Sequence, residues 1–201
     1  MRHLTIPPTL FLALFVLPTQ MAFADEPGYS CKPELGCNEI QGPAYDVGRG
    51  ALLALPHGWK VYSYPTAPDP IMAGLREIRA VSDGLIIAIS PFPNIDHREF
   101  SQATLCDMMD KAGKRYASAS KEQTVAPVPV SRDGYVSCQV SFSAKNDGEK
   151  PFGVLPNRRH ASVTTLVVAY KRDVVFSVSV VSERQPDEAY LAAVEAIRQI
   201  Q

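Results

Sequence analysis

The sequence predicts an α+β fold in which helices pack on an antiparallel β-sheet of about six to seven strands. Runs of β-branched and aromatic residues come in pairs, and each pair is joined by a short segment typical of a hairpin turn. A helical period of apolar residues occurs in two segments that lie far apart in the chain. Because strands and helices do not alternate regularly, the pattern argues against a doubly wound parallel sheet.

Residues 1–24 have the layout of a secretory signal peptide. Arg2 precedes an apolar stretch over residues 10–17, and Ala22 and Ala24 give the small-x-small pattern of a cleavage site. The apolar stretch is shorter than the roughly 20 residues needed to cross a bilayer. We therefore expect cleavage near Ala24 and a periplasmic or secreted protein with no membrane insertion.

Residues 25–50 are rich in proline and glycine, contain the first two cysteines and show little apolar periodicity. This composition predicts an irregular N-terminal arm. The predicted single domain covers residues 51–201 and is long enough to bury a sizeable core.

The first strands of the domain are expected in "ALLALPHGWKVYSYP", where a Pro-His-Gly break separates two β-rich runs. In the second run, Trp59 and Val61 fall on one face, whereas Tyr62 and Tyr64 fall on the other. A hairpin follows at residues 82–84, because Asp-Gly favours the positive φ angles of a tight turn. Its second strand, residues 85–89, is apolar on both faces and is therefore expected to lie inside the sheet.

The first helix is predicted over residues 98–116, with a buried stripe of Leu105, Met108, Met109, Ala112 and Tyr116. Just before it, "IDHREF" brings Asp96, His97 and Glu99 together. These residues have the pattern of acid/base machinery, but a capping box explains them equally well, and we favour the capping box.

Two further hairpins and a second helix complete the predicted fold. The first hairpin turns at residues 132–134, and the strand after it alternates between an inward face and a wet face. The inward face consists of Val136, Cys138, Val140 and Phe142, and the wet face of Tyr135, Ser137, Gln139 and Ser141. The second hairpin turns at residues 171–173. The last helix starts at Pro186, has Asp187 and Glu188 in its first turn, and buries Tyr190, Val194 and Ile197.

The four cysteines are expected to form two disulfides, because an even number in an exported protein favours a disulfide framework. Cys31 and Cys37 enclose a short loop; the alternatives, a redox pair or half a metal site, lack Cys-x-x-Cys spacing and a second ligand pair. Cys138 is on the inward face of its strand, and Cys106 lies beside the apolar stripe of the first helix. We therefore predict that Cys106 and Cys138 join helix to sheet.

Composition and motifs narrow the function. The chain has 20 Lys and Arg against 21 Asp and Glu, so it has no basic excess to attract nucleic acid. His57, His97 and His160 lie far apart, and the sequence contains no nucleophile elbow, zinc-protease motif or phosphate-binding loop. We expect no catalytic residues, no cofactor and no metal.

The segments "LPHGWKVYSYP", "GLIIAISPFP" and "VTTLVVAYKRDVVFSVSVV", in this order with a helix between strand pairs and a helix at the end, resemble the PsbP-like family. Its fold is shared by the extrinsic photosystem II protein, a Ran-binding nuclear import factor and small bacterial periplasmic proteins. The resemblance covers residues 51–201 and rests mainly on Leu-Pro-x-Gly-Trp at residues 55–59. It implies an α/β/α sandwich that binds other proteins, generally without catalysis. The disulfide arm and a long later loop depart from the family pattern.

That loop, residues 145–160, is much longer than a hairpin connection, and long loops in compact domains tend to be functional or disordered. It mixes apolar residues with arginines, as protein interfaces do. The partner-binding residues we predict are Phe152, Leu155, Arg158, Arg159 and His160, with Tyr62 and Tyr64 as further candidates. The alternative is a loop whose apolar residues fold back onto the domain.

We expect a non-catalytic binding protein whose partner is another protein, such as an immunity protein that neutralises a toxin in the cell envelope. An assembly factor or chaperone is the alternative within this class. A small-ligand carrier or an enzyme with a pocket built from scattered residues is the alternative outside it. The sequence leaves the oligomeric state open, including a homodimer.

Overall fold

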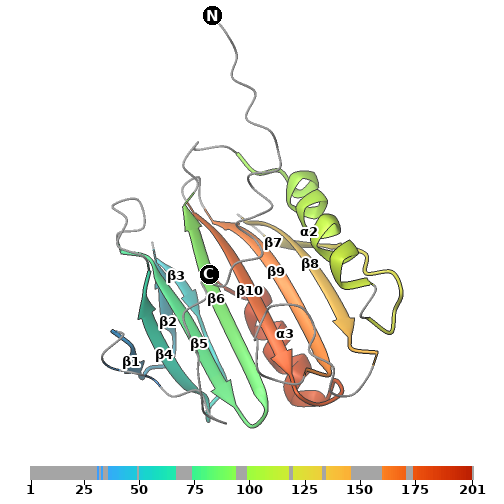
Figure 1. The fold of residues 1–201 in the computed structure, drawn as a ribbon. Helices are drawn as coiled ribbons and strands as arrows, with labels where there is room; N and C mark the ends of the chain where they lie inside the picture. Colours follow the sequence, from blue (N-terminus) through green and yellow to red (C-terminus); the bar gives the residue numbers. More distant parts are fainter. Residues whose placement is uncertain are drawn as a thin grey trace, which may run out of the picture.

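The computed structural model describes residues 31, 33, 36–48, 50–66, 74–93, 99–117, 120–132, 135–145, 160–170 and 174–200. Figure 1 shows the elements, which in chain order are β1 (Asn38–Ile40), β2 (Tyr45–Gly48), β3 (Ala51–Leu53), β4 (Lys60–Pro65), β5 (Arg76–Ser82), β6 (Leu85–Pro93), α2 (Gln102–Ala117), β7 (Val128–Arg132), β8 (Tyr135–Ser143), β9 (Ser162–Tyr170), β10 (Val174–Ser182) and α3 (Glu188–Arg198). The predicted signal peptide, residues 1–24, lies outside the described residues.

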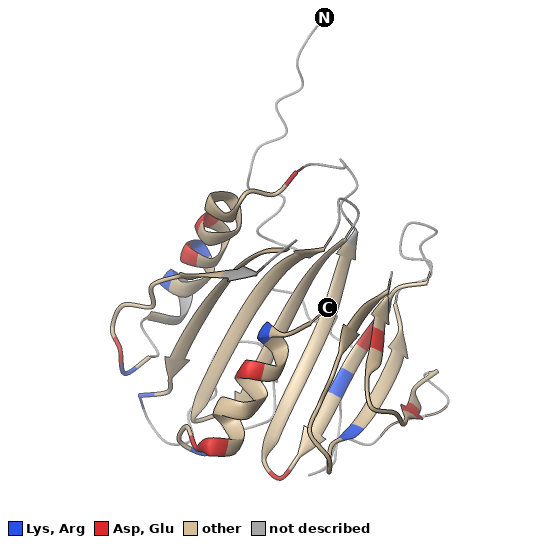
Figure 2. Ribbon diagram, turned by 180° about the vertical axis from the view of Figure 1, so that it is seen from behind, with Lys and Arg blue, Asp and Glu red and all other residues tan. Residues whose placement is uncertain are grey.

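Within the described residues, eight strands form one antiparallel sheet in the order β1-β4-β5-β6-β10-β9-β8-β7, and β2 and β3 form a second, two-stranded sheet. Helix α2 lies on one face of the large sheet and α3 on the other (Figures 1 and 2). The predicted α+β class, with helices flanking an antiparallel sheet, is confirmed. The described strands of the large sheet exceed the predicted number because β1 adds one at its edge.

The predicted hairpins are present. Ser82 pairs with Leu85, and the turn between them places Asp83 and Gly84 at φ +24° and +76°, as a two-residue turn requires. Strands β7 and β8 pair up to their turn, and so do β9 and β10. Strand β6 is central, as predicted, because it pairs with β5 on one side and β10 on the other.

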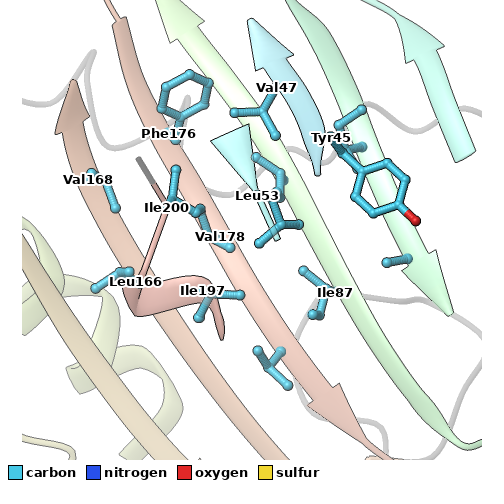
Figure 3. Packing of buried hydrophobic residues seen from close by; sticks show 14 of the residues in the cluster. Tyr45, Val47, Leu53, Ile87, Leu166, Val168, Phe176, Val178, Ile197 and Ile200 are labelled. Carbon is cyan, nitrogen blue, oxygen red and sulfur yellow. The ribbon is translucent and has the colours of Figure 1, made fainter. Parts of the chain in front are cut away.

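The largest hydrophobic cluster among the described residues lies on the face of the sheet that carries α3. Side chains from the sheet, from β2 and β3, and from α3 meet there (Figure 3), including Val47, Leu53, Phe176 and Ile197, each at 0% exposure. As predicted, α3 buries Tyr190, Val194 and Ile197, and it buries Ala193 as well. The β2–β3 pair therefore works as an additional cover on this face.

The prediction that one face of β8 is wet is wrong over most of its length. Ser137 and Gln139 are buried, at 4% and 6% exposure, although Ser141 is exposed. Gln139 accepts a hydrogen bond from Nε of Arg198 at 2.9 Å, so the end of α3 reaches this strand. The alternation of polar residues predicted a solvent-exposed face. In the structure, the Ser137 and Gln139 side chains instead face polar groups of neighbouring elements.

The prediction of an irregular arm over residues 25–50 is also wrong in part. Residues 38–40 pair with β4 as strand β1, and residues 45–48 form β2. Tyr45 and Val47 belong to the core on the α3 face. The chain therefore contributes to the core before Ala51, where the predicted domain begins.

Both helices begin later than predicted. Helix α3 begins at Glu188 instead of Pro186, and Asp187 is its N-cap, which accepts a hydrogen bond from the Tyr190 backbone N–H at 2.8 Å. Helix α2 begins later than predicted, at Gln102, and the Ser101 hydroxyl accepts from the Thr104 backbone N–H at 3.1 Å. Ser101 therefore takes the capping role that we assigned to Asp96, a residue outside the described part of the chain.

Candidate functional site

The two ends of the long loop are held by the sheet. Ser143 at the end of β8 pairs directly with Ser162 at the start of β9. One residue further out, the Ala144 N–H donates to the Ala161 carbonyl at 3.0 Å, and the Ala161 N–H donates to Ser182 of β10 at 2.8 Å. Residues 145–160 thus leave and re-enter the fold at adjacent, in-register positions.

The segment that follows α2 also holds the ends of the loop. After α2, the Lys121 N–H donates to the Ser143 carbonyl at 2.8 Å, and the Glu122 carboxylate accepts from the Ser143 N–H at 3.0 Å. Ser120 forms a bridge with Ala144. The base of the loop, which we define as residues 120–122, 143–144 and 161–162, is therefore joined by backbone and side-chain hydrogen bonds.

The predicted contact residues of the loop divide into two groups. Phe152, Leu155, Arg158 and Arg159 lie outside the described residues. His160 lies inside them and is buried at 1% exposure, so it presents little surface to a partner in this structure. Its burial reflects its position one residue before Ala161, where the chain re-enters the fold.

Tyr62 and Tyr64, predicted as further partner contacts, are also mostly covered. They are 9% and 8% exposed and form a cluster with the Cys31–Cys37 disulfide on the face of β4 away from α3. The guanidinium of Arg79 lies 5.3 Å from the centre of the Tyr64 ring. Alternation placed the two rings on one face correctly, but the arm covers that face.

Both predicted disulfides are present. Cys31 bonds to Cys37, and Cys106 of α2 bonds to Cys138 of β8, with Cα–Cα separations of 5.5 and 5.1 Å. Cys138 is fully buried, as the inward face of its strand predicts. The second bond joins helix to sheet, and such bonds fit an oxidising compartment.

A partly buried charged group on β5 is a feature that the sequence reasoning missed. Glu77 lies opposite Tyr64, and Arg79 lies opposite Tyr62, all on the face away from α3. A Glu77 oxygen and an Arg79 nitrogen are 3.8 Å apart, and the side chains are 25% and 11% exposed. The available signal was the alternation of Glu77 and Arg79 with the apolar Ile78 and Ala80. Figure 2 shows charged residues on this half of the sheet, whereas β6, β8, β9 and β10 contain none.

Burial controls the protonation of this group. It raises the pKa of Glu77, and the nearby Arg79 charge opposes the rise without cancelling it. Burial also raises the pKa of Tyr64, whose hydroxyl is buried without a hydrogen-bond partner among the described residues. The group can therefore bind a proton more readily than an exposed carboxylate, at a cost to the fold when it is ionised.

The acid/base reading of "IDHREF" is not tested, because Asp96 and His97 lie outside the described residues. Within the part of the chain that the structure describes, no three His, Cys, Asp or Glu side chains come together as a metal site. No helix of that part is long and apolar enough to cross a membrane. Comparisons with family models, curated proteins and solved structures found no match to this chain.

Proposed function

We propose that the chain is a non-catalytic protein-binding domain of the periplasm that neutralises a protein toxin acting in the cell envelope. The observation that carries the proposal is the insertion of residues 145–160 between β8 and β9 at a point where Ser143 and Ser162 already pair. A short turn would connect these strands, so the additional chain is not needed for the fold. Long connections on a rigid scaffold are where binding residues concentrate.

The rigidity of the loop base favours binding. A surface that is ordered before binding loses less conformational entropy when a partner docks. The hydrogen bonds of Ser143, Ala144 and Ala161 hold the base, and the Cys106–Cys138 disulfide fixes α2 on the same strand, β8. Such a scaffold suits an inhibitor that must block its target without being reshaped by it.

The composition of the loop supports a protein partner. Phe152 and Leu155 are the proposed apolar anchors, and Arg158 and Arg159 the proposed charged contacts. A guanidinium can hold a carboxylate through two hydrogen bonds, and enzyme toxins often use carboxylates in catalysis. Occupying these carboxylates would inhibit such a toxin.

The PsbP-like resemblance is part of this proposal, because that family uses a sheet between helices to bind other proteins. Two features of the chain support it. Leu55 and Trp59, from the motif that carries the resemblance, pack against the core on the α3 face. The helices α2 and α3 flank the sheet on opposite faces (Figures 1 and 2).

The first experiment identifies the partner. The tagged protein is cross-linked in the periplasm of the bacterium that produces it and is recovered with whatever it binds. The proposal expects a folded enzyme whose activity falls in proportion to the added protein. Recovery of unfolded envelope proteins, with no enzyme inhibited, would instead support an assembly factor or chaperone and contradict the toxin assignment.

The second experiment tests the loop by calorimetric titration with the captured partner. Residues 146–159 are replaced by Asn-Gly, a change that spares the buried His160 and the paired base. Affinity should fall by at least about 100-fold, while Tm stays within about 2 °C of the parent.

Phe152→Ala and Arg159→Ala should each cost about 2 kcal/mol of binding free energy. Lys111→Ala, on the exposed face of α2, is the matched control and should bind normally. Full affinity in the folded loop variant would place the binding surface elsewhere.

A further inference from the structure

The two edges of the large sheet are protected in different ways. At one edge, the Val130 carbonyl of β7 accepts from the Ser137 hydroxyl at 2.7 Å, so the backbone of Val130 faces β8. Since neighbouring residues of a strand face opposite sides, the backbone of Pro129 faces outward, where its nitrogen has no hydrogen to donate. Proline therefore weakens this edge as a template for another strand.

The other edge contains no such proline inside its longer strand. Strand β4 has the sequence Lys-Val-Tyr-Ser-Tyr-Pro, which has high β propensity and a proline only at its end. Its outer side is covered by β1, through three residue pairs: Asn38 with Ser63, Glu39 with Tyr62 and Ile40 with Val61. Because β1 is so short, it forms few hydrogen bonds with β4. Its pairing with β4 therefore depends on the segments that anchor it.

The anchor on the N-terminal side is the Cys31–Cys37 disulfide. The half-cystine at Cys37 is 2% exposed and packs with Tyr62 and Tyr64 of β4. Gly36, at φ +73°, allows the turn to approach Pro65: a Cβ at Gly36 would lie 3.0 Å from its ring. The disulfide thus holds the turn against β4, and β1 follows directly.

We propose that this disulfide arm, which consists of Cys31, Gly36, Cys37 and β1, is an edge cover that keeps the chain monomeric, and that β4 joins β4 of a second copy when Cys31 and Cys37 are dithiols. Opening requires an external dithiol, which donates two electrons and two protons to the cystine and leaves as a disulfide. Closing is the reverse exchange with an external disulfide. Without the bond, β1 separates from β4 and exposes its backbone groups.

The sequence of β4 suits pairing with itself. Residues directly opposite in antiparallel strands share a face, so a twofold axis through residue 62 places Tyr62 opposite Tyr62 of the second copy. Lys60 then lies opposite Tyr64, and Val61 opposite Ser63. Aromatic cross-strand pairs are favourable, and this register opposes no like charges.

The experiment measures oligomeric state by light scattering after gel filtration at several micromolar concentrations. The parent should be monomeric, and Cys31→Ala/Cys37→Ala should form a concentration-dependent dimer. Glu39→Pro, which keeps both disulfides and disrupts only β1, should also dimerise. Cys106→Ala/Cys138→Ala is the matched control and should stay monomeric. A monomer in both arm variants, or a dimer of the parent, would overturn the proposal.

The register is tested by adding one cysteine to the Cys31→Ala/Cys37→Ala variant. Tyr62→Cys should give a covalent dimer on oxidation, because opposite Cα atoms lie about 4.5–5.5 Å apart. Lys60→Cys, on the same face, should not, because residue 60 of each copy is then four residues away from its counterpart along the strand. A covalent dimer through residue 60 and none through residue 62 would show that β4 does not pair in this way.

Discussion

The two faces of the large sheet use different means to hold a helix. On one face, α3 buries Tyr190, Ala193, Val194 and Ile197 in a core that β2 and β3 also cover, and Asp187 caps the helix. On the other face, the described side chains of α2 include few fully buried apolar ones, chiefly Leu105 and Met109, and the helix is joined to β8 by a disulfide.

The difference shows how a covalent bond compensates for limited packing. At Gly113, α2 comes so close to the segment after it that a Cβ would lie 2.5 Å from the Val125 carbonyl oxygen. Close approach brings backbones together but buries little apolar side-chain surface. We therefore infer that α3 is held mainly by hydrophobic burial, whereas α2 depends on its disulfide.

The largest effect should follow removal of the α2 disulfide. Cys106 and Cys138 are 32 residues apart, so the chain-entropy model gives about 3.7 kcal/mol of stability for the bond. In Cys106→Ala/Cys138→Ala, hydrogen exchange of the α2 amides should accelerate much more than that of the α3 amides. Equal acceleration in both helices would show that α2 does not depend specifically on the bond.

The next effect tests packing on the α3 face. Ile197→Ala removes a side chain with 0% exposure and should cost about 3 kcal/mol of unfolding free energy in urea. Leu191→Ala, in the same helix but 61% exposed, is the control and should change stability by less than about 0.5 kcal/mol. A similar loss in both variants would contradict the view that α3 is held by burial.

A smaller effect is expected at the close contact of α2. Gly113→Ala places a methyl group against the Val125 carbonyl, and relief requires a backbone shift that should cost about 2 kcal/mol. Alanine favours helix by up to about 1 kcal/mol over glycine, which partly offsets the clash. Thermal unfolding measures the net change. A rise in Tm would show that the helix can move away from Val125 at little cost.

The smallest effect concerns Glu77, on the half of the sheet away from α2. Because burial raises its pKa, the folded chain binds this proton more tightly than the unfolded chain does. Its contribution to stability is therefore greatest below the unfolded pKa and is lost as pH rises through the folded pKa. Glu77→Gln should raise Tm at pH 7 by less than the about 2–4 °C that 1 kcal/mol gives in a domain of this size. The gain should vanish in acid; a gain that persists at pH 4 would point to a cause other than ionisation.

Local patterns in the sequence were enough for most of the secondary structure. The Asp83–Gly84 turn and the two-sided apolar pattern of β6 depend on residues close in the chain, and both were predicted correctly. The start of α2 was not, because Ser101 and Asp96 are both good caps and the sequence does not rank them. The Cys106–Cys138 pair was predicted from strand alternation and helix periodicity, and the Cys31–Cys37 pair from the short loop that these two cysteines enclose.

The candidate site was less predictable. Its loop was recognised from length and composition, and the paired positions of Ser143 and Ser162 come from the sheet register. His160, Tyr62 and Tyr64 were assigned to the surface because polar and aromatic residues in short stretches suit an interface. Their burial depends on segments distant in sequence, and alternation cannot report which element covers a face.

What the sequence determined by itself is most of the strands, turns and helices from residue 51 onward, because alternation, turn residues and caps act over a few positions; the short strands β1 and β2 were missed. What only the tertiary structure decided is which polar residues are covered. Gln139 is buried where Arg198 reaches it, and Glu77 lies on a face shared with the tyrosines that the N-terminal arm covers. The physical reason is that burial is set by contacts between distant segments, and each such contact depends on the order of strands in the sheet.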